Sequence, residues 1–412
     1  MKIIYLHQHF RTPDQMGGTR SYEFARRWVG WGHSVTMITT RQVGADRYRG
    51  WRVRDVKGIS VHELCVPYSN SMGFSGRILA FLRFAVHSGI RAAKVGGDVV
   101  FATSTPLTIA LPGVLASRRL GVPSVFEVRD LWPEIPIAIG VLRNPVLIRI
   151  ARRLERWAYR NSSRVIALSP GMADGVARGG APRNRITVVP NSCDLDLFQA
   201  GDAERFLAEH TEWRDRPIVL YAGTFGDING VGYLVELAAR MRHLDPRPLV
   251  LLVGEGRQGE SIRARAEELG VLGVNLEILP SLPKTRLPDV LAAASVATSV
   301  VIDCPPLWHN SANKFFDALA ADRAVAINHE GWQADLIRQF SLGVVLPPTD
   351  FDAAARILTD FLRDPFQAQQ AGSAAGTLAR ARFSREQLAR QALDVLIDAV
   401  GPKTSDPRLP AG

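Results

Sequence analysis

Lys314 and Asp317, two charged residues three positions apart, are the side chains of this chain best suited by type and spacing to bind a ligand. They follow a polar loop ending near Ser311 and Asn313, either of which could cap a helix. In a helix from about 314 to 321 both face the same side of the first turn, whose free N–H groups favour an anion. This combination suits the diphosphate and ribose of a sugar nucleotide. An ordinary capped helix with solvated charges is the alternative.

A second group of candidates follows the predicted strand 124–128. It consists of Glu127, Arg129, Asp130 and Glu134. The carboxyl ends of strands are the usual place for chemistry in open α/β sheets. A Trp-Pro pair ends the strand abruptly, so we expect the acids to lie at this crevice. A structural ion pair between Arg129 and Asp130 is the alternative.

Glycine-rich turns follow three further predicted strands. Gly17 and Gly18 precede a helix, Gly223 and Thr224 open another turn, and Glu255 lies between two glycines. Glycine lets the backbone approach a ligand closely and present its amides. None of these turns matches the dinucleotide fingerprint or a P-loop, so binding of NAD or ATP loses support.

Strands and helices alternate along the whole chain, and most strands are continuously apolar. That pattern is typical of parallel sheets covered on both faces. A length of 412 residues is too great for one core and fits two domains. We therefore expect a basic, acceptor-side N-terminal Rossmann-like domain, a C-terminal nucleotide-sugar domain, a C-terminal helix packing near the first domain and a disordered tail, over residues 1–205, 206–382, 383–400 and 401–412.

The composition indicates a folded protein of the cytoplasm. Hydrophobic residues make up 46% and charged residues 22% of the chain. No apolar run approaches the ~20 residues of a membrane span, and the first strand is too short for a signal peptide. The three cysteines have no metal-site spacing, so we expect buried thiols in a reducing compartment.

The net positive charge is confined to the N-terminal half. Residues 1–200 hold 28 Lys and Arg against 13 Asp and Glu, a net charge of +15, whereas the remainder carries −5. This asymmetry favours an anionic partner such as lipid headgroups, nucleic acid or a phosphorylated acceptor. A GC-rich genome would explain a preference for Arg over Lys, but it would not explain the asymmetry.

Two predicted helices in that half, at about 78–91 and 145–160, combine apolar residues with basic ones. Met72 and Phe74 precede the first helix. Docking on an anionic membrane leaflet explains this pattern, and ordinary domain helices with solvated arginines are the alternative. Nucleic-acid binding has less support, because the basic helices lack interleaved aromatic residues and no reader motif is present.

Four segments, in order and at sensible spacing, resemble the family 4 glycosyltransferases over roughly residues 1–400. They are Val188–Phe198, Tyr221–Val231, Leu251–Gly256 and Asn313–Ala321. The Arg-Asp-Leu-Trp-Pro-Glu run is similar to that of the amino-sugar (fucosamine-type) transferases that build O-antigen, capsule or exopolysaccharide. The resemblance implies an α/β protein of the GT-B fold, with two doubly wound Rossmann-like domains facing each other across a cleft.

The resemblance also implies an activity. The expected reaction is retaining transfer of a sugar from a UDP- or GDP-sugar to a lipid-linked saccharide, without a bound metal or other cofactor. The enzyme would act in the cytoplasm, peripherally on the inner face of the plasma membrane and without nucleic acid. A nucleotide-sugar epimerase sharing the two-domain architecture is the alternative enzyme class.

The candidate residues then divide into three roles. The leaving diphosphate would be held by Lys314 with the amides of the turns at 17–18 and 223–224. Asp130 would orient or deprotonate the acceptor hydroxyl, or stabilise the reacting carbon. The catalytic candidates are Asp130 and Lys314; the donor-binding candidates are Gly17, Gly18, Gly223, Thr224, Glu255, His309, Asn313, Lys314 and Asp317; the acceptor-side candidates are Glu127, Arg129 and Glu134.

The chain departs from the family pattern at several of these positions. Thr224 and Asn229 stand where many members carry the Arg and Lys that hold the diphosphate. His309 replaces the first of two paired glutamates, and Arg129 stands where a His is common. After the donor helix, Asp322 and Ala324 replace the usual Gly and Pro.

Overall fold

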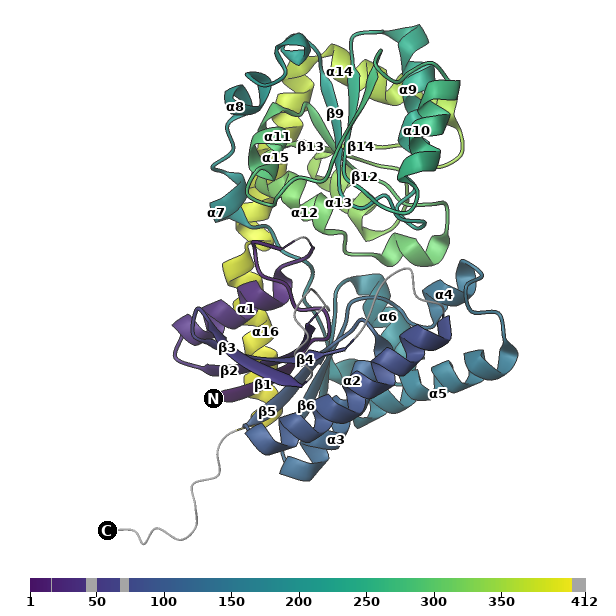
Figure 1. Ribbon diagram of the computed structural model, residues 1–412. Coiled ribbons are helices and arrows are strands. Elements are labelled where there is room, and N and C mark those ends of the chain that lie inside the picture. The colour runs from purple at the N-terminus through teal and green to yellow at the C-terminus, as the bar shows by residue number, and fades with distance from the viewer. Residues whose placement is uncertain (16, 42–49, 67–73, 402–412) are drawn as a thin grey trace, which may run out of the picture. The chain divides into compact units, whose positions relative to one another are not determined.

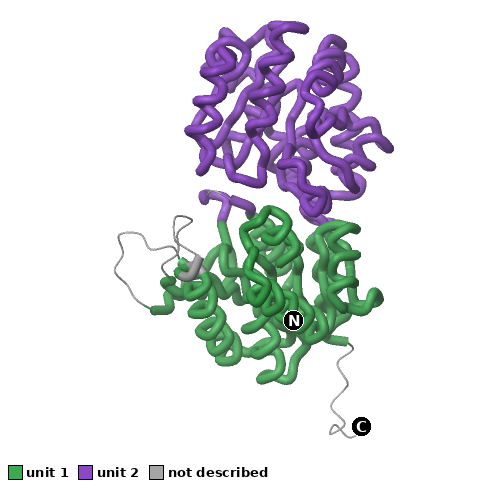
Figure 2. Tube along the Cα trace, turned by 90° about the vertical axis from the view of Figure 1, so that its right-hand side faces the viewer, with its two compact units in different colours: residues 1–11, 19–189, 389–412 green, residues 12–18, 190–388 purple. Residues whose placement is uncertain are grey.

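The chain folds into two compact α/β units, each with its own sheet and its own buried core (Figure 2). The computed structural model describes residues 1–15, 17–41, 50–66 and 74–401. Unit 1 comprises residues 1–11, 19–189 and 389–412, and unit 2 comprises residues 12–18 and 190–388.

Within the described residues, unit 1 contains an eight-stranded sheet of order β3-β4-β2-β1-β5-β6-β7-β8. All neighbouring strands are parallel except the hairpin of β3 and β4. The strand order reverses between β1 and β5, which makes their carboxyl ends a topological switch point. The strands are β1 (Lys2–Leu6), β2 (Ser34–Arg41), β3 (Trp51–Val56), β4 (Ile59–Cys65), β5 (Val99–Thr103), β6 (Ser124–Val128), β7 (Arg164–Ala167) and β8 (Ile186–Val188).

Helices cover this sheet (Figure 1). Helix α3 packs against both α2 and α5 and also contacts β5 and β6. The apolar side chains of the central strands are buried from both sides, which explains their unbroken hydrophobic runs. The helices of unit 1 are α1 (Arg20–Gly30), α2 (Phe74–Val95), α3 (Ala110–Leu120), α4 (Glu134–Ala138), α5 (Pro145–Asn161), α6 (Pro170–Arg178) and most of α16 (Arg385–Val400), with 3-10 turns η1 (Leu107–Ile109) and η2 (Arg183–Arg185).

Within the described residues, unit 2 contains a six-stranded, fully parallel sheet of order β11-β10-β9-β12-β13-β14. Its order reverses between β9 and β12, so the loops after these two strands meet at a switch point. The strands are β9 (Ile218–Ala222), β10 (Leu249–Val253), β11 (Leu276–Leu279), β12 (Val296–Ser299), β13 (Ala324–Ile327) and β14 (Gly343–Val345).

The helices of unit 2 form two groups: α9 packs with α10 and α14, whereas α12 and α13 pack with α15. Helix α15 is one that the sequence analysis did not anticipate, because its Ala- and Gly-rich sequence has a weak helical pattern. The helices are α7 (Leu195–Phe198), α8 (Ala203–Leu207), α9 (Gly232–Leu244), α10 (Gly259–Glu268), α11 (Leu287–Ala293), α12 (Asn313–Ala320), α13 (Trp332–Phe340), α14 (Phe351–Arg363) and α15 (Pro365–Arg382), with 3-10 turns η3 (Thr211–Trp213) and η4 (Pro305–His309).

The division between the units falls at 189/190, earlier than the boundary of 205 expected from the sequence. The segment after Val189 packs with unit 2. The backbone N–H of Asn191 donates to Ser311 Oγ at 3.0 Å, and that of Asp202 donates to Asp289 Oδ1 at 3.0 Å. At the other end, residues from Ala389 onward belong to unit 1, where the indole of Trp28 donates to the Ala389 carbonyl at 2.9 Å.

The turn after α12 accommodates its unusual residues. Asp322 adopts a positive φ of 55° and pairs with Arg380 of α15 at 3.1 Å. Gly372 and Gly376 of the same helix face it, and a Cβ at either position would clash with Asp322. The glycines of α15 therefore make room for the aspartate in this turn.

One expectation about the cysteines is wrong, and some other expectations concern residues that the structure does not describe. Cys193 and Cys304 are buried as expected, but Cys65 is partly exposed. Met72, the side chain of Phe74 and residues 402–412 lie outside the described part. Among the described helices, none is long and apolar enough to cross a bilayer.

Candidate active site

The centre of the candidate site in unit 2 is the close approach of Lys314 to Gly223. Gly223 follows β9 and Lys314 lies in the helix after β12, so the two residues meet at the switch point. Gly223 has a φ of +157°, and a Cβ placed on it would lie 3.0 Å from Lys314 Nζ and closer still to Cε. The missing side chain of Gly223 is what lets the lysine pass over this turn.

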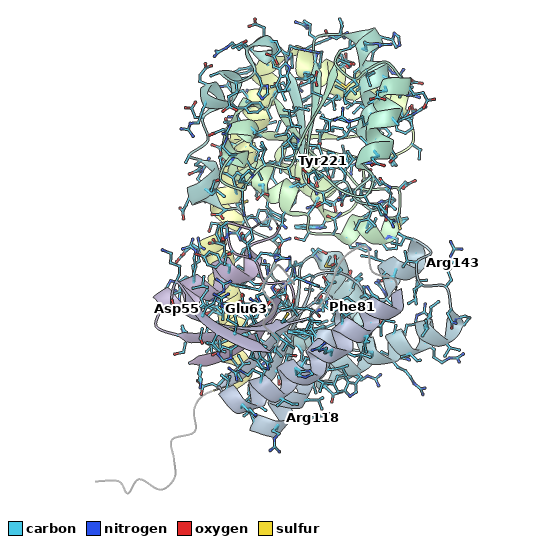
Figure 3. All side chains as sticks on the ribbon, viewed as in Figure 1. Asp55, Glu63, Phe81, Arg118, Arg143 and Tyr221 are labelled. Atoms are coloured by element: carbon cyan, nitrogen blue, oxygen red, sulfur yellow. The ribbon has the colours of Figure 1, made fainter. Side chains whose placement is uncertain are left out.

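Lys314 is held against an aromatic ring. Its Nζ lies 5.1 Å from the centre of the ring of Tyr221, the second-last residue of β9 in unit 2 (Figure 3). The Tyr221 hydroxyl donates to the Thr224 carbonyl at 2.8 Å and so fixes the glycine turn. Burial lowers the pKa of Lys314 to about 8, and the nearby charge of Asp317 acts in the opposite direction. The ammonium is thus poorly solvated, and an anion would stabilise it.

The turn offers fewer amides than the sequence analysis assigned to it. The Gly223 N–H donates to the Val253 carbonyl at 2.9 Å, so it is already bound. Within the described residues, no acceptor engages the N–H of Thr224, which is exposed. Only the second of the two proposed amides is therefore free for a phosphate.

The start of α12 is not capped by a side chain. The helix begins at Asn313, and the prediction that Ser311 or Asn313 caps it is wrong. Ser311 Oγ instead accepts from the Asn191 N–H at 3.0 Å, and Asn310 Oδ1 accepts from the Ala312 N–H at 3.2 Å. The Phe315 N–H donates to the Ala312 carbonyl at 3.2 Å. Among the described residues, no acceptor engages the N–H groups of Asn313 and Lys314, so these two first-turn amides remain available to an anionic ligand.

Asp317 lies one turn further along, partly exposed and among several charges. Burial raises its pKa, the charges of Lys284 and Arg385 lower it, and that of Asp194 raises it. Asp194 in turn pairs with Arg385 at 3.6 Å and with Lys284 at 3.9 Å. Asp317 thus lies near a cluster of opposite charges, formed by Asp194, Lys284 and Arg385, and Lys314 is not the only cation that acts on it.

The remaining donor candidates lie on turns and at the start of a helix. His309 is half-buried in the turn before α12, and Asn313 is exposed as the first residue of that helix. Glu255 has an exposed side chain, while its carbonyl accepts from the Phe225 N–H at 2.9 Å. Gly17 and Gly18 precede α1, and Gly17 has a φ of 122° that favours glycine.

In unit 1, Arg129 and Asp130 follow β6 and are both partly exposed. The Arg129 N–H donates to Ser104 Oγ at 2.9 Å, which ties this loop to the end of β5. Burial raises the pKa of Asp130, and the Arg129 charge partly offsets that effect. Asp130 is therefore a partly exposed carboxylate with a raised pKa at this strand end.

Glu127 is placed differently from what its acceptor-side assignment requires. Its side chain is fully buried, it pairs with the equally buried Arg20 at 2.9 Å, and it accepts a hydrogen bond from Thr103 Oγ1. Arg20 also donates to the Val189 carbonyl at 2.9 Å. This burial argues against direct contact between Glu127 and a substrate. Glu134, by contrast, is exposed as the first residue of α4.

Sequence reasoning missed several residues that shape these sites. Two histidines after β1 lie near Arg129; burial lowers the pKa of His9 to about 4 and that of His7 well below its usual value. Both imidazoles are therefore neutral at pH 7. Arg20, Tyr221 and Lys284 were also missed, because each depends on a contact between distant segments. Only the position of Tyr221 at a strand end could have indicated its role.

The described residues of the two units assemble no set of metal ligands. Among the residues that the structure describes, no group of three or more His, Cys, Asp or Glu side chains is placed to hold a metal ion.

Comparison with known proteins identifies the two halves of the chain. Residues 17–192 match the model of a glycosyl transferase 4-like domain, and residues 202–377 match that of the glycosyl transferases group 1. The chain is 24% identical over 312 residues to the probable glycosyltransferase WbjE of Pseudomonas aeruginosa, covering 73% of this chain and 76% of that protein.

A further relative is the putative colanic acid biosynthesis glycosyl transferase WcaI of Escherichia coli, 24% identical over 309 residues, which cover 71% of this chain and 74% of that one. Among solved structures, Anabaena Alr3699/HepE in complex with UDP-glucose aligns with a TM-score of 0.71 at 18% identity, covering 96% of this chain and 99% of that chain. These similarities confirm the predicted GT-B fold.

Proposed function

From the premise that this chain is a family 4 glycosyltransferase, we propose that it moves a sugar from a nucleotide-diphosphate sugar to a hydroxyl group of a lipid-linked glycan, with retention at the anomeric carbon. The product would enter a bacterial surface polysaccharide. The observation that carries the donor assignment is the position of Lys314 against Gly223, with Asp317 one helical turn away.

The donor's diphosphate would be held by Lys314, the Thr224 amide and the open first turn of α12. Each of these groups can donate to phosphate oxygens, and a poorly solvated ammonium gains most from such a partner. The ribose hydroxyls would be accepted by Asp317. The relative crystallised with UDP-glucose supports a UDP-sugar, and a GDP-sugar remains the second choice.

The charge that develops on the leaving diphosphate would be met by Lys314 and these N–H groups. A bound metal is not part of this proposal, because the lysine already supplies a cation beside the turn. Full activity after treatment with a chelator is the expected result. Activity that is lost with chelator and restored by Mg²⁺ would contradict this part.

The acceptor hydroxyl would be oriented or deprotonated by Asp130. A carboxylate with a raised pKa is a better proton acceptor at neutral pH than an ordinary one, and Asp130 is partly exposed at a strand end. Arg129, held by Ser104, would contact anionic or hydroxyl groups of the acceptor. The relative in colanic acid biosynthesis supports a polysaccharide as the destination of the sugar.

We further propose that unit 1 docks on the inner face of the plasma membrane. Helix α2 exposes a stripe at helical spacing, formed by Leu79, Leu82, Val86 and Ile90, which are 68%, 44%, 61% and 54% exposed. Helix α5 exposes Val146 and Ile150 beside a row of arginines. Exposed apolar side chains flanked by basic ones favour an anionic bilayer surface.

The donor assignment can be tested by a thermal-shift screen of UDP- and GDP-sugars, since a ligand that binds the folded state raises the melting temperature. The unaltered chain and the control Asp335→Ala, a first-turn carboxylate of α13, should respond equally. Lys314→Ala and Asp317→Ala should lose the response. Equal shifts in all four proteins would contradict the site.

The reaction itself is tested by following the nucleotide. A transferase releases nucleoside diphosphate only as the acceptor is consumed. An epimerase would convert the sugar nucleotide without any acceptor and without releasing nucleoside diphosphate, and that outcome would overturn the proposed function.

A further inference from the structure

A cavity of about 450 Å³ lies between α4, α5 and α6 of unit 1, and its lining contains none of the donor-site residues. We call it the α4–α6 pocket. Its lining includes Glu134, Arg152, Glu155, Arg156 and Arg178. A second hollow, of about 470 Å³, runs along α5 and shares Arg152 and Arg156 with the first. Two arginines of one helix thus face two adjoining hollows.

The walls of the pocket are in direct contact with one another. Gly175 and Gly179 of α6 line it. A Cβ at Gly175 would lie 2.7 Å from Leu131, and one at Gly179 would lie 2.7 Å from a ring carbon of Tyr159. These two glycines therefore let α6 pack closely on the loop after β6 and on α5. The hollow therefore lies between elements that pack on one another.

The arginines of the pocket are unpaired within the part of the chain that the structure describes. No ion pair engages Arg152, Arg156 or Arg178, all of which are exposed. Arg183, which follows α6 in the chain, pairs with Asp174 of that helix at 2.5 Å, so other exposed arginines of unit 1 do form ion pairs. Three planar cations at one hollow are suited to bidentate binding of phosphate oxygens.

The acidic residues of the pocket reduce this positive charge only in part. Burial raises the pKa of Glu155 to about 7, and the charge of Glu134 acts in the same direction. The hydroxyl of Tyr159 and the charges of Arg152 and Arg156 act in the opposite direction. Glu155 therefore carries less negative charge at neutral pH than an ordinary glutamate. The pocket as a whole is cationic.

The surroundings of the pocket indicate the rest of the ligand. Pro133 and Glu134, which line it, follow Asp130 by three and four positions in the chain. The start of α5 exposes Val146 and Ile150, which are 58% and 56% exposed, on the helix that carries the arginines. A cationic pocket thus lies between the loop of the proposed acceptor residue and an exposed apolar surface.

We propose that the α4–α6 pocket binds the phosphate or diphosphate group that joins the acceptor saccharide to its lipid. The hydrocarbon part of the same molecule would contact the exposed apolar side chains of α5. This inference rests on the proposed function in one respect, that the acceptor is lipid-linked. A soluble phosphate ester would present the same chemistry to the arginines, and the experiment separates the two sources.

The first measurement is calorimetric titration with sodium pyrophosphate. All variants carry Lys314→Ala as well, so that the donor site does not contribute to the signal. Arg152→Gln with Arg156→Gln, and Arg178→Gln separately, should each weaken binding by about tenfold or more. Arg153→Gln is the matched control, since Arg153 is an exposed arginine of α5 that lines neither hollow. Equal affinity in all of these proteins would overturn the pocket.

The second measurement separates the sources of phosphate. Decyl phosphate, kept monomeric, should bind about tenfold more tightly than methyl phosphate, because its chain can cover apolar surface. Val146→Ser with Ile150→Ser should remove that difference and leave the affinity for methyl phosphate unchanged. Equal affinity for both esters in the unaltered chain would overturn the lipid part of the proposal.

The third measurement uses Glu155, which faces Glu134 of α4, Arg152, Arg156 and Tyr159 of α5, and Arg178 of α6. Glu155→Gln imitates the protonated carboxyl. The ratio of its pyrophosphate affinity to that of the unaltered residue should rise between about pH 6 and about pH 8, as the glutamate ionises and repels the anion. The titration of pyrophosphate itself cancels in this ratio. A constant ratio would contradict the assignment of the pocket.

Failure of this proposal can be distinguished from failure of the proposed function. If nucleotide sugars raise the melting temperature of an Arg178→Gln protein that retains Lys314, and pyrophosphate binds all of the Lys314→Ala variants alike, only the pocket is rejected. If nucleotide sugars shift no variant, including the unaltered chain, the donor assignment is rejected whatever the pocket binds.

Discussion

Lys314 Nζ lies beside Gly223, at 3.0 Å from where a Cβ on that glycine would be. The two residues are far apart in the sequence and meet because β9 and β12 are neighbours at the switch point of the sheet. A side chain at position 223 and the present course of the lysine are mutually exclusive. The absence of a Cβ is thus part of how the cation is positioned.

We expect Gly223→Ala to weaken donor binding by about tenfold or more, because the new methyl group must displace the methylenes of Lys314. The KM for the nucleotide sugar would rise and its thermal shift would disappear. The control is Gly226→Ala, where the nearest atom to a new Cβ is 3.5 Å away, at Asn229 Nδ2. Equal losses in the two variants would mean that the turn is merely sensitive to any substitution.

Donor binding should depend on pH through Lys314. Its pKa is lowered to about 8 in the free protein, and a bound diphosphate would raise it again. Binding therefore takes up protons near pH 8, and the affinity for donor falls as the pH rises above that value. In the unfolded chain Lys314 has its ordinary, higher pKa, so the unfolded chain binds more protons than the folded one between these two pKa values. The contribution of Lys314 to the free energy of unfolding therefore rises with pH in this range.

This proton uptake can be measured by titration calorimetry in buffers of different ionisation enthalpy. At about pH 8 the unaltered chain should take up about half a proton per donor bound. Lys314→Arg, which stays charged, should take up none from this position. The same uptake in both proteins would assign the proton to another group.

The sequence predicted the two α/β domains and the order of strands and helices because each strand that is buried on both faces is continuously apolar. It also predicted Lys314 and Asp317 as a pair, since both belong to one helical turn. Neither result depends on contacts between distant segments. What it could not predict is the Tyr221 ring beside Lys314, or Lys284 and Arg385 around Asp317, because these neighbours come from other elements.

Glu127 illustrates the same limit in unit 1. From the sequence it is one of several acids near a strand end, and the sequence of β6 does not reveal that its side chain is buried. Its burial follows from its pairing with Arg20, which approaches from a helix more than a hundred positions earlier in the chain. The Ser311 cap failed for a similar reason, since that hydroxyl is engaged by Asn191.

Because Glu127 and Arg20 are both buried, removing one partner should destabilise unit 1 strongly. Glu127→Gln is expected to lower the free energy of unfolding by about 3–5 kcal/mol. The control is Asp174→Asn, which breaks the exposed pair with Arg183 and should cost less than about 1 kcal/mol. Urea unfolding followed by circular dichroism measures both. Similar small losses would show that the Arg20 guanidinium finds another partner.

Asp130 should affect turnover rather than donor binding. Asp130→Asn removes the group that would accept a proton, and general-base catalysis typically contributes about 10²–10⁴-fold. We therefore expect kcat to fall by at least about a hundredfold while the calorimetric affinity for the nucleotide sugar stays the same. A loss of donor affinity with kcat preserved would assign Asp130 to the donor instead.

The exposed stripe of α2 should contribute to membrane association. Leu79→Ser with Val86→Ser removes two side chains that are 68% and 61% exposed, and each fully buried in lipid would contribute about 1.5–3 kcal/mol. Co-sedimentation with vesicles containing anionic lipid should therefore fall by about tenfold or more. Phe366→Ser, which removes a 64% exposed ring from unit 2, should leave co-sedimentation unchanged.

Pelleting of the unaltered chain with these vesicles should weaken as salt is added, because arginines of α5 take part. If the chain does not pellet even at low salt, or if the double variant pellets as well as the control, this surface does not bind membranes.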